Sequence, residues 1–482
     1  MSRSVKSNFL WNASYQMLLV LAPLVTTPYL SRVLGAEQVG IYSYTYSITN
    51  YFVIFATLGM ANYGVRTVSS AGGDRPLRSR LFWGAYFAQL VVAVPVAAIY
   101  YAYLAVAPQG GLLIAGTWSL WVLSAALDVS WLFFGVEEFR LPTERSFITK
   151  LLSIIAIFLF VKGPEDLWIY CLAISSSYLA NQILTWPFVR RYVDFVRPTW
   201  ADVRQHFGPN LRLFAPVVAI SLYTALDKIM LGAISGMEQA GYYEYAEKIS
   251  KMPMSIITAL GTVMLPRMTS ALAKGKRNEA RGLLEESMWV MQAAAMGLAF
   301  GIAAVAPEFC PVFFGPGYEE CIIIMPVVAA VIPIISASNV IGVQYMLPAF
   351  SDRPYTLSVC IGAMANILLN LMLLKPLGAL GAAVATVAAE LSVLVFQCWV
   401  VREKLPVCIY ARESVPFAAC GMFMLITVRA ISGILERTVW GLCVEIAAGV
   451  LVYLLLAVLW CVISGRTSKL LALLGAGQES VG

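Results

Sequence analysis

The segment EQVGIYSY at residues 37–44 recurs as EQAGYYEY at residues 238–245, at a constant offset of 201 residues. Five of the eight positions are identical, and the tripeptide LGA precedes each copy, at 34–36 and 231–233. Six predicted membrane spans separate the copies. Because six is even, both copies cross the membrane in the same direction, as in membrane proteins built from two parallel repeats.

The composition around this repeat is that of a membrane protein. Hydrophobic residues make up 60% of the 482 positions and charged residues only 12%, against about 45–50% and about 25% in soluble domains. So few charges cannot cover a surface that faces water, whereas a bilayer accepts apolar side chains. The net charge of +6 does not indicate nucleic-acid binding, because Lys and Arg occur in short loops between apolar stretches.

Apolar stretches long enough to cross a bilayer recur along the chain. A helix needs about 20 residues to cross a hydrocarbon layer of about 30 Å. About fourteen stretches meet this length, which predicts an all-α polytopic membrane protein. The predicted spans are 8–30, 40–63, 81–105, 112–135, 146–162, 167–189, 213–234, 241–266, 289–306, 321–347, 355–374, 378–401, 415–432 and 440–463.

Lysine and arginine are distributed unevenly between the two sets of connecting loops. Twenty-five lie in loops, tails or span ends on one side, five lie in loops or span ends on the opposite side, and three, Lys228, Lys248 and Lys251, lie deeper within predicted spans. Cytoplasmic loops carry the excess of Lys and Arg in membrane proteins. Both termini are therefore predicted to be cytoplasmic, and the loop at 307–320 is predicted to be external.

The repeat also predicts the domain organisation. Spans one to six and seven to twelve are expected to form two parallel six-helix lobes around a central cavity, followed by two C-terminal helices. The predicted domains are 1–212, the N-terminal lobe with a cytoplasmic linker, 213–404, the C-terminal lobe, and 405–482, the two extra helices with a short cytoplasmic tail.

A polar stripe follows the repeat motif in both halves. In the second half, four charges share one helix face at positions i, i+3, i+4 and i+7: Glu244, Glu247, Lys248 and Lys251. The same offset in the first half holds Ser43, Tyr46, Ser47 and Asn50. A charge at the bilayer centre costs about 2.5–3.5 kcal/mol, so these residues are expected to line a wet cavity. Alternatively, the stripe only holds helices together, because its charges form i,i+4 pairs in the favourable order.

Other polar residues lie inside predicted spans. Asn12 and Gln16 are expected to face inward, as cavity-lining groups or as hydrogen bonds between helices. Asp128 and Asp227 have no cation at i+4 and are candidates for ion coupling, although a neutral helix contact explains Asp128 equally well. No metal site is predicted, because the single histidine, His206, lies in a basic loop and the nine cysteines form no CxxC pair.

Three segments are similar to a known family. They are PYLSRVLGAEQVGIYSYTYSITNYFVIFATLGMANYGVR at 28–66, LDKIMLGAISGMEQAGYYEYAEKI at 226–249 and NILLNLMLLKPLGALGAAVATVAAE at 366–390. These segments closely resemble Wzx-like flippases of polysaccharide repeat units, which belong to the multidrug/oligosaccharidyl-lipid/polysaccharide exporter superfamily. The resemblance extends over roughly residues 8–400.

The resemblance implies a transporter and not an enzyme. It implies that an undecaprenyl-diphosphate-linked oligosaccharide moves by alternating access from the cytoplasmic to the periplasmic leaflet of the bacterial inner membrane. The product would serve O-antigen, capsule or exopolysaccharide synthesis. The implied partners are the lipid-linked substrate, membrane lipids, and a polysaccharide polymerase with its chain-length regulator. No cofactor is implied, other than a proton or sodium gradient where a member is ion-coupled.

A diphosphate cannot enter hydrocarbon without cations that offset its desolvation. The residues expected to bind it are Lys228, Lys248, Lys251, Arg32 and Arg66. For the two arginines, a role as interfacial anchors is an equal alternative. A related flippase of a peptidoglycan precursor looks like it uses a cationic cavity. In this chain the three intramembrane lysines are accompanied by four carboxylates, so the predicted cavity is not plainly cationic.

Two other functions are compatible with a polytopic helical protein. An ion-coupled multidrug antiporter of the same superfamily would share the two lobes but bind small organic cations. A membrane-embedded glycosyltransferase or polymerase would need a catalytic loop facing the sugar, and the predicted external loops are short. The chain also lacks the GxxxxGK[ST], HExxH and GxSxG motifs of common catalytic sites.

Overall fold

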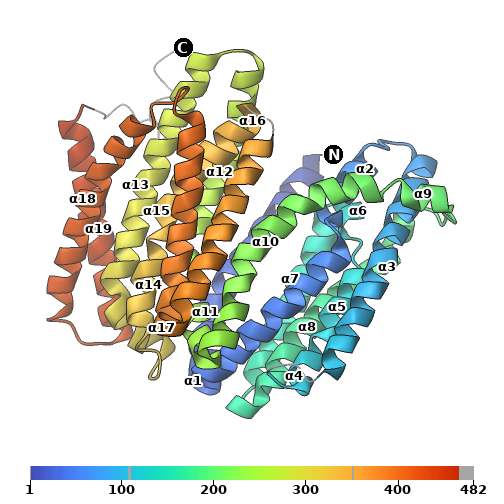
Figure 1. Ribbon diagram of the computed structural model, residues 1–482, viewed down its shortest axis with the longest axis horizontal. Helices are drawn as coiled ribbons and strands as arrows, with labels where there is room; N and C mark the ends of the chain where they lie inside the picture. The colour runs from blue at the N-terminus through green and yellow to red at the C-terminus, as the bar shows by residue number, and fades with distance from the viewer. Residues whose placement is uncertain (1, 107–109, 350–351, 466–482) are drawn as a thin grey trace. The chain divides into compact units, whose positions relative to one another are not determined.

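The computed structural model describes residues 2–106, 110–349 and 352–465, and the regular structure in these ranges is helical (Figure 1). The helices of the first half are α1 (Ser2–Thr57), α2 (Met60–Ser69), α3 (Arg75–Ala105), α4 (Leu112–Thr117), α5 (Ser119–Ala126), α6 (Ser130–Gly135), α7 (Arg140–Phe160), η1 (Pro164–Asp166), α8 (Leu167–Thr185), η2 (Trp186–Arg191), α9 (Trp200–Arg204) and α10 (Phe207–Ser235). Those that follow are α11 (Met237–Lys251), α12 (Met254–Ala273), α13 (Arg277–Phe309), η3 (Cys310–Phe314), α14 (Cys321–Ala329), α15 (Val331–Ser338), η4 (Asn339–Met346), α16 (Leu347–Ala349), α17 (Asp352–Val401), α18 (Val407–Ser432) and α19 (Val439–Ile463).

The predicted membrane architecture is confirmed. Among the described residues, nine helical segments are long and apolar enough to cross a membrane. Two of them, Ser14–Ser69 and Arg353–Val401, contain 56 and 49 residues, and each is long enough for two crossings. The predicted total of about fourteen spans is consistent with these segments.

Glycine residues bend the two longest helices. The chain reverses inside α1 at Gly35, with φ 76° and ψ 169°, and inside α17 at Gly378, with φ 54° and ψ −131°. Residues with a Cβ rarely adopt such positive φ values, whereas glycine adopts them readily. Each glycine therefore ends one apolar helix and starts the next without an intervening loop.

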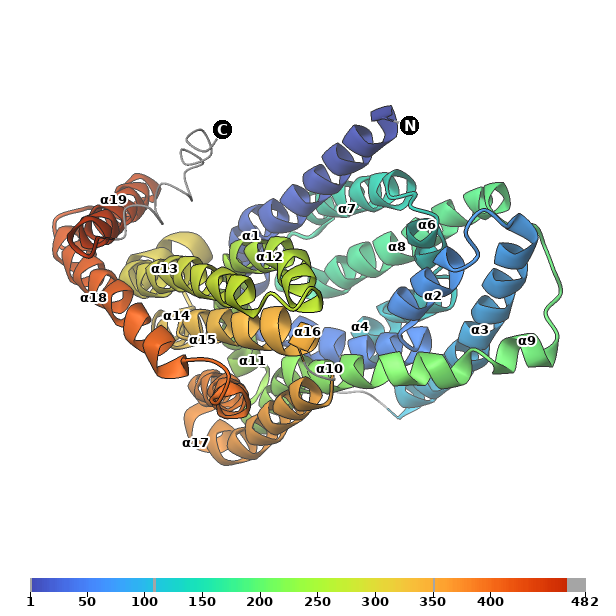
Figure 2. The same ribbon diagram turned by 90° about the horizontal axis from the view of Figure 1, so that it is seen from above.

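The chain divides into two compact units, residues 1–241 and 242–482. In the first unit, α1 packs against α3, α5, α7 and α10 (Figures 1 and 2). A buried aromatic cluster that includes Phe82, Trp131 and Phe133 forms one core of this unit. The predicted division at 212–213 and 404–405 stays a prediction.

Helix α13 is central to the second unit. It packs against α12, α14, α15, α18 and α19, and α18 and α19 lie beside it at the edge of this unit in both views (Figures 1 and 2). The core between these helices includes Leu284 and Met291 from α13, Ile332 from α15 and Val340 from η4. The two C-terminal helices are thus attached to the second unit through α13.

Candidate functional site

The repeat motif adopts the same backbone conformation in its two copies. Gly35 has φ 76° and ψ 169°, and Gly236, 201 residues later, has φ 101° and ψ 162°. Each glycine immediately precedes the helix that carries the polar stripe. The equivalence seen in the sequence is therefore matched in the backbone.

The two copies also cross each other with reciprocal contacts. A Cβ on Gly40 would lie 1.6 Å from the carbonyl oxygen of Met237, and a Cβ on Gly241 would lie 1.9 Å from the carbonyl oxygen of Ala36. Met237 and Ala36 are again 201 residues apart. Glycine lets helix backbones approach this closely, and the reciprocity indicates a local two-fold relation between segments 36–40 and 237–241.

The first stripe lies on α1, within the first unit. Ser43 and Ser47 are buried, and Tyr46 and Asn50 are half-buried. The Tyr46 ring stacks on Trp121 of α5 at a centroid distance of 4.7 Å. This face of α1 therefore packs, at least in part, against aromatic side chains of its own unit.

The second stripe lies on α11. Glu244 and Glu247 are buried, whereas Lys248 and Lys251 are half-buried. Lys251 Nζ lies 2.7 Å from Glu247 Oε1, which is the i,i+4 pair that the spacing predicts. Lys248 Nζ lies 6.0 Å from the centroid of the Tyr245 ring, at the outer limit of a cation–π contact. The stripe thus combines buried carboxylates with more accessible ammonium groups.

The predicted span 241–266 is broken just after this stripe. Helix α11 ends at Lys251 and α12 begins at Met254. Pro253 lies in the break and accounts for it, because proline has no N–H to donate and its ring collides with the carbonyl four residues earlier. Lys251 therefore occupies the last residue of a helix, where the helix dipole favours a cation.

Asp227 and Lys228 lie next to each other on α10. Asp227 is 2% exposed and Lys228 is half-buried. Helix α10 packs against α1, where the Tyr51 hydroxyl donates to the Ser221 carbonyl oxygen at 3.0 Å. The same tyrosine interacts electrostatically with Asp227, so this carboxylate belongs to the α1–α10 contact.

Asp128 occupies a break in the predicted span 112–135, which forms three short helices, α4, α5 and α6. Asp128 Oδ1 accepts hydrogen bonds from the Ser130 backbone N–H at 2.9 Å and from Ser130 Oγ at 2.6 Å. Buried Gln89 on α3 donates to the carbonyl oxygens of Ala125 at 2.7 Å and Asp128 at 3.1 Å. Non-helical backbone at membrane depth needs such partners, and sequence reasoning missed Gln89 as their source.

The remaining predicted residues are not gathered at one point. Arg32 is exposed and its Nη1 donates to the Pro28 carbonyl oxygen at 2.7 Å. Arg66 is exposed in the last turn of α2. Arg32 precedes the reversal at Gly35 and Arg66 follows the second half of α1, so they lie at opposite ends of this span. Gln16 is exposed, and the Asn12 side chain lies outside the described residues.

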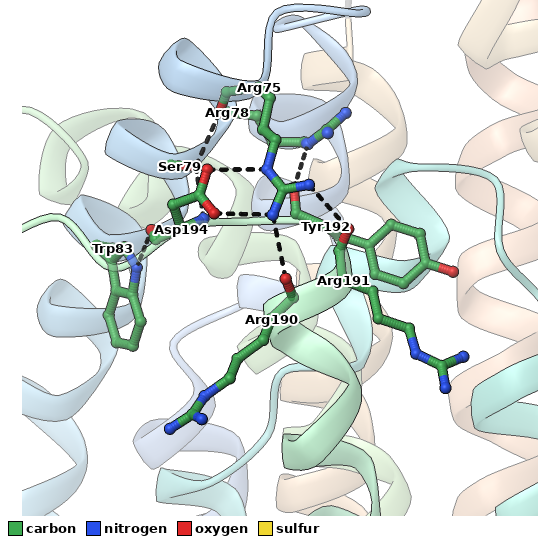
Figure 3. Close-up of polar contacts among 8 residues, drawn as sticks. All are labelled: Arg75, Arg78, Ser79, Trp83, Arg190, Arg191, Tyr192 and Asp194. Carbon is green, nitrogen blue, oxygen red and sulfur yellow. Dashed lines mark hydrogen bonds and ion pairs between the residues drawn. The ribbon is translucent and has the colours of Figure 1, made fainter.

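Arginines on the polar end of α3 hold the linker that follows α8 (Figure 3). Arg75 binds Asp194 through two hydrogen bonds of 2.8 Å, and Arg78 Nε donates to the Tyr192 carbonyl oxygen at 3.0 Å. The Trp83 indole N–H donates to the Asp194 carbonyl oxygen at 2.9 Å. The hydrogen bonds from Arg75 keep the pKa of Asp194 below its usual value. The hydrogen bonds of these arginines therefore hold the linker against α3.

The linker continues into a second group of contacts. Hydrogen bonds from Thr199, together with Arg80 at 2.8 Å, lower the pKa of Asp202 to about 2. His206, 2% exposed, has its Nδ1 2.6 Å from the Tyr63 hydroxyl. Burial lowers the pKa of His206 below its ordinary value, so the imidazole is neutral at physiological pH.

A charged group that sequence reasoning missed lies on the second unit. Arg429 pairs with Glu308, and Glu445 lies inside the predicted span 440–463. The sequence signal that could have revealed this group is Glu445, a carboxylate within an apolar span. An ionisable residue inside a membrane is energetically costly, so it is usually retained for a function.

Comparisons with known proteins match this architecture. A family model described as "Polysaccharide biosynthesis protein" matches residues 5–272. An Escherichia coli (strain K12) protein named "Putative O-antigen transporter" is 26% identical over 412 residues, which cover 84% of this chain and 99% of that protein. A Haloferax volcanii protein named "Probable low-salt glycan biosynthesis flippase Agl15" is 20% identical over 74% of this chain and 75% of its own length.

Among solved structures, the one described as "Lipid II flippase MurJ, inward closed conformation" superposes with a TM-score of 0.73. It covers 95% of this chain and 100% of its own, at 14% sequence identity. At this identity the similarity shows a shared fold.

Proposed function

Because this chain belongs to the polysaccharide biosynthesis protein family, we propose that it is a flippase for undecaprenyl-diphosphate-linked oligosaccharide repeat units. It moves them from the cytoplasmic to the periplasmic leaflet of the bacterial inner membrane, with both termini in the cytoplasm. The observation that carries this proposal is the match to the Escherichia coli protein named "Putative O-antigen transporter" over 99% of that protein's length. Products would enter O-antigen, capsule or exopolysaccharide synthesis, through a polymerase and its chain-length regulator.

The charged stripe on α11 supports a role in holding the diphosphate. Glu247 pairs with Lys251 at 2.7 Å, so the lysine is compensated when substrate is absent. An arriving diphosphate would exchange with the carboxylate as the partner of the ammonium group. Lys228 and Lys248, both half-buried, supply further cations, while Arg32 and Arg66 are proposed to meet the phosphates near the two membrane surfaces.

Polar residues on the predicted spans are proposed to line the path. They comprise Asn12, Gln16, Ser43, Tyr46, Ser47, Asn50, Glu244 and Glu247. Asp128 and Asp227 are the candidates for coupling to a proton or sodium gradient, and Asp128 Oδ1 accepts two hydrogen bonds from Ser130. The two parallel repeats suggest two lobes that alternate in access around a central cavity.

The proposal is tested in a bacterial strain that lacks its own flippase and is complemented with this chain. Surface glycan is measured against the amount of folded protein in the membrane. Wild type is expected to restore glycan, whereas Lys228→Ala and Lys248→Ala lose most of it at normal protein levels. Lys248→Arg is expected to keep part of the activity, because it preserves the charge. Lys274→Ala, which removes an exposed lysine, is the matched control.

Two results would contradict different parts of the proposal. If well-folded wild-type protein restores no surface glycan with any tested lipid-linked substrate but exports organic cations, the flippase assignment is wrong. If wild type restores glycan and the lysine variants do so equally well, the flippase assignment stands and the phosphate-binding role fails.

A further inference from the structure

Three charged side chains interact where α13, α18 and α19 pack together: Arg429 pairs with Glu308, and Glu445 interacts electrostatically with both. Glu308 on α13 is 5% exposed and Glu445 on α19 is 1% exposed. Arg429 on α18 donates through Nη1 to Glu308 Oε2 and to the Ala304 carbonyl oxygen, the latter at 3.4 Å. These helices are three of the apolar segments long enough to cross the membrane.

Glu445 is the unusual member of this cluster. Its Oε2 is buried and has no hydrogen-bond partner among the described residues. Glu445 interacts electrostatically with both Glu308 and Arg429. If both carboxyl groups were ionised, one guanidinium, 38% exposed, would face two negative charges, and one buried carboxylate would remain uncompensated. Burying an unpaired ionised carboxylate is far costlier than burying its protonated form.

Among the residues that the structure describes, Arg429 is the cation that acts electrostatically on Glu445. Tyr453, two helical turns further along α19, donates its hydroxyl hydrogen to the Ala293 carbonyl oxygen at 2.5 Å. Glu436 and Arg437, in the connection between α18 and α19, are exposed to solvent. Ala304, Met424 and Val428 form an apolar core beside the cluster. Charge balance within the cluster therefore rests on its own three members.

We propose that Glu308, Arg429 and Glu445 form a proton-binding site, in which the two carboxyl groups share one exchangeable proton and the guanidinium balances the remaining charge. The proton comes from the medium and bonds to a carboxylate oxygen, and its release leaves both carboxylates ionised. Arg429 lies three residues before the end of α18, about 4.5 Å along the helix. Glu445 lies six residues after the start of α19, about 9 Å, so the site is close to one membrane surface.

The lysine and arginine distribution predicts that this surface is the external one. The site would then respond to the pH outside the cell. It is also separate from the charged stripe on α11 and does not depend on which molecule the protein transports. Its direct consequence is a tighter contact between α13 and α19, because the proton removes repulsion between Glu308 and Glu445 on these two helices.

Infrared difference spectroscopy on the full-length protein in lipid nanodiscs tests the proposal, because a protonated carboxyl group has its own carbonyl stretch. Wild type is expected to show one such band at neutral pH that disappears on alkaline titration. Glu445→Gln and Glu308→Gln are each expected to lose it, because one carboxylate then pairs with Arg429. Glu436→Gln, which removes an exposed carboxylate beside the same helices, is expected to retain it. Thermal unfolding and size-exclusion chromatography verify that each variant is folded.

Three outcomes would overturn the proposal. If the spectra of wild type and Glu445→Gln do not differ in this band, both carboxylates are ionised. If the band survives in both glutamine variants, the proton resides elsewhere. If sodium removes the band at constant pH, the site binds a metal cation instead.

Discussion

His206 is a buried imidazole that the fold keeps neutral. Its Nδ1 lies 2.6 Å from the Tyr63 hydroxyl, and its Nε2 is buried without a hydrogen-bond partner among the described residues. Since burial lowers the pKa of His206 in the folded protein, the unfolded chain takes up a proton first as the pH falls. Folding stability contributed by this residue is therefore complete well above about pH 6.5 and declines below it.

We expect the melting temperature of wild type to fall between about pH 7 and pH 5.5, around the ordinary pKa of histidine. His206→Gln should show a smaller decrease over the same interval, because glutamine does not titrate. Thermal unfolding of the purified full-length protein at several pH values measures both. Equal slopes for the two proteins would mean that His206 does not contribute to the pH dependence.

At the scale of helices, the crossing of the two repeat motifs has no room for a side chain. A Cβ on Gly40 would lie 1.6 Å from a backbone oxygen, which cannot move independently of its helix. Gly40→Ala and Gly241→Ala are therefore each expected to lower the free energy of unfolding by about 1–3 kcal/mol or more, as overpacking typically does. Gly282, on α13, has open space around it, so Gly282→Ala should gain about 0.5–1 kcal/mol.

Thermal unfolding in detergent, with folded yield from size-exclusion chromatography, distinguishes these variants. A crossing that tolerates alanine at both positions would show that the backbone contact is not maintained in the folded protein. If Gly40→Ala lowers the melting temperature and Gly282→Ala raises it, the effect of the backbone contact is separated from the general preference of helices for alanine.

At the scale of the whole molecule, the testable feature is membrane topology. The charge distribution places the 307–320 loop outside and the connection between α12 and α13 inside. In a variant without the nine native cysteines, Glu319→Cys is expected to react with an impermeant thiol reagent in intact cells. Lys274→Cys should react only after the membrane is opened. Both positions are exposed, and they avoid the positive φ angles of Gly317 and Gly275. The reversed pattern would place the termini outside.

Several properties followed from the sequence because they depend on local composition. Length and hydropathy predicted the membrane spans, and a constant offset of 201 residues predicted the repeat, whose glycines Gly35 and Gly236 share one backbone conformation. The spacing of the α11 charges predicted the Glu247–Lys251 pair, because residues four apart on a helix are always neighbours.

Other properties were decided only by tertiary structure. The break at Asp128 is possible in a membrane because Gln89, 39 residues away, supplies hydrogen bonds to its backbone. Likewise, Glu308 and Arg429 are 121 residues apart, and only the packing of α13, α18 and α19 brings Glu445 to them. A sequence period reports which residues share a face of one helix. Which distant partner compensates a buried charge depends on how the helices pack, because electrostatic compensation acts through space and not along the chain.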